Sequence, residues 1–207
     1  MMLRFLFFVF LLLLALALPA QDGLRVVTAS LYWPHDLQEI TDFEFYGCCR
    51  GNNGQEKRAS STLASQNGHH YGVDQLADND IKTAWVEAAK GDGVEEFLTF
   101  KLPYDKAYRD AADGAHFFPN AFYLANGYQK SQQAFLENNR VRRLKMYVNG
   151  VAFCYLDLLD QPGVQILETK LVDHLDAERG TVEIKIEIAS VYPGEKYQDT
   201  AITELFW

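Results

Sequence analysis

The segment Thr181–Val191 constrains the fold of this chain more than any other part of its sequence. It reads T-V-E-I-K-I-E-I-A-S-V, in which Val182, Ile184, Ile186 and Ile188 alternate with polar residues. A period of two gives a strand one apolar and one polar face, as in an antiparallel sheet that is covered on one side. A helix cannot use this spacing. The pattern therefore predicts a β-sheet scaffold, whose loops carry any functional residues.

Shorter segments of similar character run through the rest of the chain and are separated by turn signals. The clearest signal is Asn149-Gly150 between two apolar segments, which is typical of a two-residue β-hairpin. The expected strands are 24–31, 96–102, 120–126, 141–148, 151–156, 164–168, 181–191 and 202–205. Such a series of short strands predicts an all-β fold, an antiparallel β-sandwich.

Residues 1–20 have the pattern of a secretory signal peptide. Arg4 precedes an apolar run from Phe5 to Leu18, and Pro19-Ala20 then leads into polar residues. The alternative is a transmembrane anchor, but the run is shorter than the roughly 20 residues that span a bilayer. We therefore expect cleavage after Ala20 and a secreted or periplasmic chain that does not span the membrane.

The charge of the remaining chain narrows the classes of partner. The formal net charge is −9, and it becomes −10 because Arg4 is the only charged residue lost with the signal peptide. General nucleic-acid binding needs a basic surface that displaces counterions, so this class is disfavoured. The chain is expected to have two parts: an N-terminal extension over residues 21–58 and a compact domain over residues 59–207.

The chain contains three cysteines, and disulfides are permitted in an exported protein. Pairing Cys154 with Cys48 or Cys49 would tie the extension to the domain and leave one thiol over. Two alternatives stay open: a strained bond between the adjacent Cys48 and Cys49, or three reduced thiols. A zinc site is disfavoured because the chain has no C-x-x-C pair and no histidine at ligand spacing.

Four segments together resemble a known family. They are Tyr71–Glu87, which contains D-N-D-I-K-T-A-W, then Asn126-Gly127-Tyr128, Asn138-Asn139-Arg140 and Asp199–Glu204. In this order they resemble the F5/8 type C domain (discoidin, galactose-binding-like), in particular the subgroup attached to secreted NAD glycohydrolase toxins as a glycan-binding translocation domain. The resemblance spans about residues 60–207. It implies a jelly-roll sandwich that binds sugars without catalysis, because the NAD-cleaving chemistry of such toxins belongs to a separate domain.

The D-N-D-I-K-T turn is rich in oxygen donors. Asp78 and Asp80 supply carboxylates and Thr83 supplies a hydroxyl, which suits a hard cation such as Ca²⁺. The family resemblance adds Glu204, and it implies a structural calcium ion held by these four residues. Asn79 stands where many family members have glycine, although asparagine tolerates the left-handed backbone conformation. The alternative is an Asx turn that is held by its own hydrogen bonds.

The resemblance also implies a sugar site at one end of the sandwich. Its candidate residues are Glu87, Asn126, Tyr128, Asn139 and Arg140. Amide and guanidinium groups bond adjacent hydroxyls in fixed geometry, and an aromatic ring covers the C–H face of a sugar. The alternative is that the same groups only fold the loops. In that case Asn139 and Arg140 bond local carbonyls, Tyr128 plugs the end of the sandwich, and Glu87 neutralises Arg140.

Two further classes of function are alternatives to a secreted glycan-binding module. A small hydrolase would need paired carboxylates, such as Glu87 with Asp92 or Asp80. The sequence sets no such pair at a usable separation and contains neither G-x-S-x-G nor H-E-x-x-H, so we do not expect an enzyme. The other alternative is a structural sandwich with a protein partner. An open polar cleft between Tyr128 and Arg140 favours a glycan, and apolar filling there favours a protein.

Overall fold

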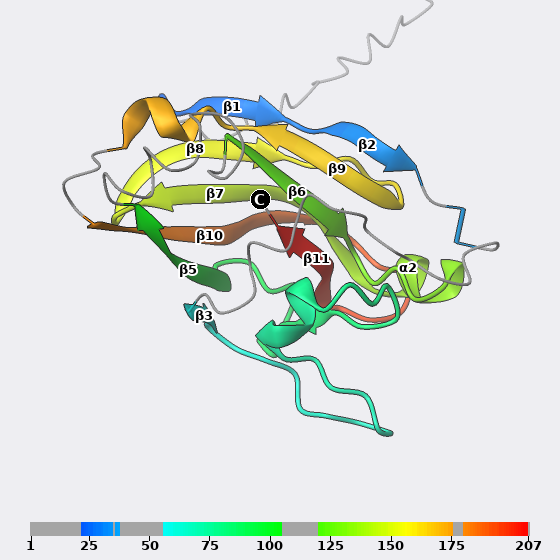
Figure 1. The fold of residues 1–207 in the computed structure, drawn as a ribbon. Coiled ribbons are helices and arrows are strands. Elements are labelled where there is room, and N and C mark those ends of the chain that lie inside the picture. The colour runs from blue at the N-terminus through cyan, green and yellow to red at the C-terminus, as the bar shows by residue number, and fades with distance from the viewer. Residues whose placement is uncertain (1–21, 35, 38–55, 105–119, 176–179, 207) are drawn as a thin grey trace, which may run out of the picture.

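The computed structural model describes residues 22–34, 36–37, 56–104, 120–175 and 180–206 (Figure 1). The strands are β1 Arg25–Thr28, β2 Ser30–Pro34, β3 Glu56–Ala59, β4 Trp85–Val86, β5 Phe97–Tyr104, β6 Ala121–Asn126, β7 Asn139–Val148, β8 Val151–Asp157, β9 Gly163–Glu168, β10 Gly180–Tyr192 and β11 Thr200–Phe206. The short helices are η2 Val73–Ala77, α2 Gln132–Glu137 and η3 Leu171–His174. In the described residues, no helix is long and apolar enough to cross a membrane.

The strands form one hydrogen-bonded sheet that folds into two layers around a common core. One layer has the order β1–β8–β7–β10–β5–β3, and the other has the order β2–β9–β6–β11, with β4 paired to β11. The layers join where the start of β11 runs parallel to β7. β1 is also parallel to β8, whereas the remaining strand pairs are antiparallel. The predicted all-β sandwich is confirmed.

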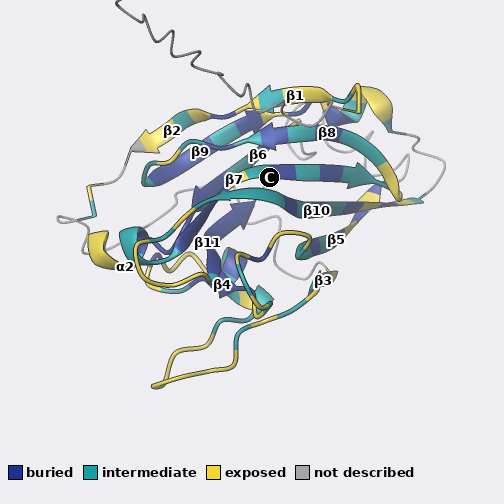
Figure 2. Cartoon of the chain, turned by 180° about the vertical axis from the view of Figure 1, so that it is seen from behind, coloured by how far each residue is buried: buried dark blue, intermediate teal, exposed yellow. Residues whose placement is uncertain are grey.

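β10 has the alternation that its sequence predicts. Val182, Ile184, Ile186 and Ile188 are at most 2% exposed and lie in the core between the layers. β10 pairs with β5 on one side and with β7 on the other, so it lies inside its layer. Figure 2 shows buried positions along the central strands. Each of these branched side chains stabilises the fold by about 1.5–3 kcal/mol when fully buried.

The β7–β8 hairpin also forms where it is predicted. Asn149 and Gly150 have positive φ angles of 49° and 78°, the combination that a type I′ turn requires. The turn pairs Val148 with Val151, and an irregularity between Met146 and Tyr147 then shifts the register by one residue, so that Leu144 lies opposite Leu156. Because the side-chain period is two, this register decides which residues of β7 reach the core.

Two prolines lie inside strands that the sequence predicts to end before them. β5 continues through Pro103, which lies opposite Thr181 of β10. Proline is tolerated there because, in the described residues, the pairing of β5 with β3 stops at Lys101 and Pro103 has one neighbouring strand. In the same way β2 includes Trp33 and Pro34, and it pairs with β9.

The start of the N-terminal extension is part of the sandwich. The single strand expected at 24–31 is two strands, because β1 pairs with β8 in one layer and β2 pairs with β9 in the other. Ala29 lies between them, and its amide donates to the carbonyl of Asp157 at 2.8 Å. The extension therefore joins both layers at one edge. The rest of it, apart from residues 36–37 and 56–58, lies outside the described residues.

Cys154 lies on β8 in the core, with its sulfur 3.9 Å from Sδ of Met146. It is a free thiol in the structure, and burial raises its pKa to about 11. The structure therefore does not show the disulfide expected at Cys154. Its expected partners, Cys48 and Cys49, lie outside the described residues, so the pairing stays a prediction.

Candidate functional site

The D-N-D-I-K-T turn follows η2 and is held by its own side chains. The amide of Asp80 donates to Oδ1 of Asp78 at 2.9 Å, and the amide of Lys82 donates to Oδ1 of Asp80 at 2.9 Å. The Thr83 hydroxyl donates to Oδ2 of Asp78 at 2.7 Å. Asn79 adopts the left-handed conformation, with a φ of 62°, which asparagine permits. The turn is thus a pair of linked Asx turns.

Glu204 of β11 faces this turn, and the partly buried Lys57 lies near enough to interact with its charge. The Glu204 side chain is fully buried, and among the described residues neither oxygen has a hydrogen-bond partner. Burial, and next the Asp78 carboxylate, raise its pKa to about 9, against the opposing effect of the amides of Asn79 and Asp80. The Asp78 carboxylate and the amides of Asn79 and Asp80 lie close enough to Glu204 to shift its pKa, but their geometry is not that of a hydrogen bond. An unpaired buried carboxylate is costly, so this position needs either a proton or a cation.

The donors at this position fit the calcium ion that the family resemblance implies. Calcium takes oxygen ligands, and Asp78, Thr83, Glu204 and the carbonyls of the turn are of this kind. Asp80 instead uses one oxygen to bond the amide of Lys82. Among the described residues, no group of three or more His, Cys, Asp or Glu side chains is arranged to hold a metal ion. The orphaned Glu204 carboxylate beside Asp78 is the feature that a cation would satisfy, and the calcium site stays a prediction.

Asn126 and Asn139, both expected at a sugar, are buried and bonded to the backbone. Nδ2 of Asn126 donates to the carbonyl of Val141 at 2.8 Å, and its Oδ1 accepts from the Val141 amide at 2.9 Å. Nδ2 of Asn139 donates to the carbonyl of Gln198 at 2.7 Å, and its Oδ1 accepts from the Gly194 amide at 2.6 Å. Each side-chain amide therefore replaces a missing stretch of strand pairing.

Arg140 is 6% exposed and holds three segments together. Its Nε and Nη2 donate to the two carboxylate oxygens of Asp160 at 2.8 and 3.0 Å. Its Nη1 donates to the carbonyls of Phe135, Leu136, Asn138 and Pro193, at 3.0 to 3.4 Å. Gly127, which has a φ of 75°, packs so closely that a Cβ would lie 2.5 Å from Cγ of Arg140. The Asn-Gly-Tyr motif therefore needs its glycine to admit the arginine.

Glu87 is also fully buried and bonded to the backbone. Its oxygens accept from the amide of Ala89 at 2.6 Å and from the amide of Thr200 at 2.9 Å, which ties the loop after β4 to β11. Burial raises its pKa, and the two amide bonds oppose that shift. The proposed neutralisation of Arg140 by Glu87 is wrong, because Asp160 is the ion-pair partner of Arg140.

The structure therefore brings four of the five expected sugar residues together as internal braces. Glu87, Asn126, Asn139 and Arg140 are each no more than 6% exposed. The sequence pattern does not separate the two roles, because a short polar side chain at a strand end suits a ligand and an unpaired backbone group equally. In this fold, backbone groups at that end, such as the carbonyls of Val141 and Gln198, take the side chains as partners.

Tyr128, the fifth residue, borders an open cleft of about 360 Å³ at the same end of the sandwich. We call it the rim cleft. It lies among the loop before η2, the helix α2 and the segment before β11, with Gln66, Gln133 and Asp199 from these three parts in its lining. Its size falls at the lower end of the range for small-ligand pockets.

Three tyrosines line the rim cleft. Tyr71 and Tyr128 pack edge to face, with ring centroids 6.5 Å apart. The Tyr128 hydroxyl donates to the carbonyl of Lys82 at 3.2 Å, and burial raises its pKa to about 12, so this phenol is neutral. Tyr197 is 42% exposed. Nζ of Lys196 lies over one face of its ring, 4.7 Å from the centroid, and the ring is otherwise partly exposed.

Asp199 is the charged group of the rim cleft that lacks a partner. In the described residues, no hydrogen bond or ion pair reaches its carboxylate, although burial and then Asp199 raise the pKa of Tyr71, which lies near it. The other charged groups are engaged. Lys130 donates to Nε2 of His69 at 3.2 Å, and Glu137 pairs with Lys196 at 3.5 Å.

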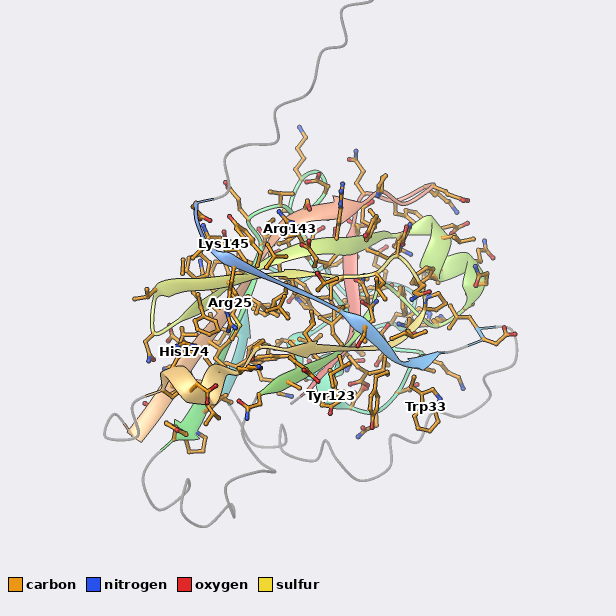
Figure 3. The ribbon with its side chains drawn as sticks, turned by 90° about the horizontal axis from the view of Figure 1, so that it is seen from above. Arg25, Trp33, Tyr123, Arg143, Lys145 and His174 are labelled. Atoms are coloured by element: carbon orange, nitrogen blue, oxygen red, sulfur yellow. The ribbon has the colours of Figure 1, made fainter. Side chains whose placement is uncertain are left out.

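The cations on the open face of β7 form no comparable site. Figure 3 labels Arg143 and Lys145 of β7, the strand that β8 separates from β1. Arg143 donates to Asp157 at 2.7 Å through Nη2, and Lys145 donates to Asp22 at 2.6 Å. Both cations also lie over the ring of Tyr155, at 5.2 and 5.4 Å from its centroid. These groups are cross-strand pairs that support the sheet.

Sequence reasoning missed Tyr71, Tyr197 and Asp199 as cleft residues. Tyr71 opens the first resembling segment and Asp199 opens the last, but nothing in the sequence places the two segments together. The pairing of β4 with β11 does so, together with the bond from the amide of Val86 to the carbonyl of Tyr71 at 3.2 Å. Tyr197 has no sequence signal beyond being an aromatic residue in a polar loop.

The sequence matches the family model of the NAD glycohydrolase translocation F5/8 type C domain over residues 48–207. The chain belongs to this family. The matched range contains the D-N-D-I-K-T turn and the rim cleft, begins before the expected domain start at residue 59, and leaves β1 and β2 outside. The family predicted from the four segments is confirmed. No curated protein matches the chain.

Several solved structures resemble this F5/8 type C chain at low identity. A structure of the CBM32-1, CBM32-2 and M60 catalytic domains of Clostridium perfringens ZmpB is 8% identical, with a TM-score of 0.49 over 90% of this chain and 17% of that one. CpGH89CBM32-5 from Clostridium perfringens, in complex with GalNAc-β-1,3-galactose, is 12% identical, with a TM-score of 0.46 over 77% and 96% of the two chains. The arabinofuranosyltransferase AftD from Mycobacteria is 19% identical, with a TM-score of 0.48 over 73% and 11%.

Proposed function

We propose that this chain is a glycan-binding module without catalytic activity, and that its sugar binds in the rim cleft. The observation that carries this proposal is the exposed ring of Tyr197 in the same cleft as the unpartnered carboxylate of Asp199. A carboxylate accepts hydrogen bonds from two adjacent hydroxyls, and an aromatic ring covers the C–H face of a sugar. The ligand class is therefore a pyranose with at least two adjacent free hydroxyls.

The character of the cleft supports a glycan over the two alternatives. Most of its lining is polar groups and tyrosine rings, and Leu63, Val86 and Ala134 are its apolar part, whereas a protein-docking site would need predominantly apolar filling. A hydrolase built on Glu87 has no support, because its carboxylate is fully buried and bonded to the amides of Ala89 and Thr200. A catalytic carboxylate must reach the substrate.

A structural calcium ion belongs to this proposal. Asp78, Asp80, Thr83 and Glu204 would hold it, and its charge would compensate the buried Glu204 carboxylate. The D-N-D-I-K-T turn also positions the rim cleft, because the carbonyl of Lys82 accepts a hydrogen bond from the hydroxyl of Tyr128. Calcium would then support sugar binding from behind the cleft rather than by touching the sugar.

We also propose that the domain acts outside the cytoplasm after removal of residues 1–20. The support for this step is the sequence pattern of a signal peptide. Mass spectrometry of the exported chain checks it, with an N-terminus at Gln21 as the expected result. A chain that keeps residues 1–20 would contradict it.

A glycan array with purified residues 21–207 tests the function, with and without a calcium chelator. Asp199→Asn should weaken binding of the best glycan about ten- to hundredfold, because a hydrogen bond to a charged group contributes about 1.5–3 kcal/mol. Asp173→Asn, an exposed aspartate on η3, is the matched control and should change nothing. Neither substitution should move the melting temperature.

The outcomes separate the competing functions. If Asp199→Asn leaves the glycan affinity unchanged, the rim cleft is not the sugar site, even if the protein binds sugars. A folded protein that binds no glycan would favour the protein-interaction alternative.

A further inference from the structure

One wall of the rim cleft is an exposed loop, residues 64–70, that holds its own shape. Gln66 and His69 exchange two backbone hydrogen bonds of 2.8 and 3.1 Å across a turn at Asn67 and Gly68. The Ser65 hydroxyl lies 2.9 Å from Nδ1 of His70. The loop is therefore a small preformed hairpin.

This loop has few ties to the body of the domain. Its two ends are fixed, because the amide of Leu63 bonds the carbonyl of Val86 and the amide of Val86 bonds the carbonyl of Tyr71. Between those ends, in the part of the chain that the structure describes, one polar contact reaches the body: Nζ of Lys130 donates to Nε2 of His69 at 3.2 Å. Lys130 directly precedes Ser131, the residue that caps α2, so this contact bridges two walls of the cleft.

We propose that residues 64–70 form a lid over the rim cleft, latched by the contact between His69 and Lys130 and released when His69 gains a proton. A lysine ammonium has donors only, so Nε2 of His69 must be the acceptor and the imidazole must be neutral. A protonated imidazole has no acceptor, and it would place a second positive charge beside Lys130. Protonation of His69 therefore breaks the latch. The proposal rests on the rim cleft as the sugar site.

The other ionisable groups around the cleft do not replace the latch. The carboxylates there are Glu137, which is paired with Lys196, and Asp199, and neither is bonded to His69. Burial raises the pKa of Tyr71 and of Tyr128, so these two phenols stay protonated in mildly acidic solution. The neighbouring His70 contacts Ser65 within the loop, so its protonation does not touch the contact between loop and body.

Opening the lid removes one wall of the cleft and so weakens sugar binding at acidic pH. A single hydrogen bond contributes about 0.5–1.5 kcal/mol, so the expected loss of affinity is about two- to tenfold. The His69→Gln variant keeps an acceptor for Lys130 but cannot be protonated. His70→Gln removes the adjacent histidine and is the matched control.

Two measurements test the lid at about pH 5.5 and about pH 7.5. Hydrogen–deuterium exchange of residues 64–70 needs no ligand: at the lower pH the loop should exchange faster in the wild type and in His70→Gln than in His69→Gln, with no difference at the higher pH. Affinity for the glycan from the array should follow the same order. Lys130→Met should open the loop at both pH values.

The two readouts distinguish failure of the lid from failure of the proposed function. Equal exchange in wild type and His69→Gln at the lower pH would overturn the latch, whatever the protein binds. If residues 64–70 exchange faster at the lower pH but the protein binds no glycan, the loop does open on protonation and its role as a lid on a sugar site is rejected.

Discussion

Two buried polar regions at the same end of the sandwich differ in how far the chain satisfies them. Around Arg140, every buried donor and acceptor meets a protein partner, from Asp160 to the carbonyl of Pro193. Around Glu204, the chain buries a carboxylate completely and leaves both oxygens without a hydrogen bond. Both regions come from segments that the family resemblance marks as functional.

The difference separates motif residues that the fold itself satisfies from Glu204, which needs either a proton or a cation. A satisfied cluster such as that of Arg140 needs nothing from outside and stabilises the loops that carry the cleft. An unsatisfied buried charge is retained only where something else compensates it. For the same reason we place the proposed sugar site at more exposed groups such as Tyr197 and Asp199.

Arg140→Ala should give the largest effect, and it should act on stability. The substitution leaves the carboxylate of Asp160 and several carbonyls without their donor, so we expect a loss of about 3–4 kcal/mol, somewhat reduced because Asp160 is partly exposed. Urea unfolding measures it. Arg142→Ala is the matched control: this exposed neighbour contacts the ring of Tyr192 at 5.9 Å, and its removal should cost about 0.5 kcal/mol or less. An unchanged midpoint for Arg140→Ala would contradict the bracing role.

Glu204→Gln should raise the stability of the fold when calcium is absent, in contrast to Arg140→Ala. At pH 7 the folded chain must keep the Glu204 carboxyl protonated, against its usual pKa of 4.5, which costs about 3 kcal/mol at about 1.4 kcal/mol per pH unit. A glutamine carries no such cost. Thermal unfolding in a chelator should therefore show a variant that is more stable than the wild type.

The pH dependence of this effect follows from the raised pKa. Between 4.5 and about 9 the unfolded chain has lost the Glu204 proton while the folded chain keeps it. The contribution of this group to the free energy of unfolding is therefore fully present below pH 4.5 and is lost as the pH rises toward 9. The stability difference between Glu204→Gln and wild type should grow across that window. A difference that is flat with pH would contradict the burial of an unpartnered carboxylate.

Calcium binding should offset the lower stability of the wild type relative to Glu204→Gln. At a calcium concentration about 100 times the dissociation constant, binding to the folded state adds about 2.7 kcal/mol. Glu204→Gln and Asp78→Asn should lose this gain, whereas Asp74→Asn, an exposed aspartate one turn earlier in η2, should keep it. Melting curves with calcium and with chelator provide the measurement. Identical wild-type melting curves with calcium and with chelator would contradict the proposed calcium site.

Most of the fold follows from the sequence because its signals are local. The alternation in β10 and the Asn149-Gly150 turn each specify a strand or a hairpin without help from distant residues. At the N-terminus, the sequence predicts a strand at residues 24–31 but not its division into two. Its division into β1 and β2 depends on which strands, β8 and β9, lie beside it, and that is a property of the assembled sandwich.

The site follows from the sequence to a smaller degree, because burial decides the role of a polar side chain. Asn126 and Arg140 are the residue types that bind sugars, and they are also the types that bond stray carbonyls. Only the packing of α2 and of the loop after β10 against Arg140 separates the two roles. Asp199 could be assigned only after β4 and β11 were seen to pair.

Tyr197→Ala should give the smallest change in stability and still reduce binding. Its ring is 42% exposed, so its loss should cost the fold about 0.5 kcal/mol or less. Stacking on a sugar contributes about 0.5–1.5 kcal/mol, so affinity should fall by about two- to tenfold in titration calorimetry. Tyr32→Ala, which removes a ring of similar exposure on β2 away from the cleft, should leave affinity unchanged. An equal loss in both variants would mean that the sugar does not select the rim cleft, since exposed rings on the two sides of the molecule would then bind it alike.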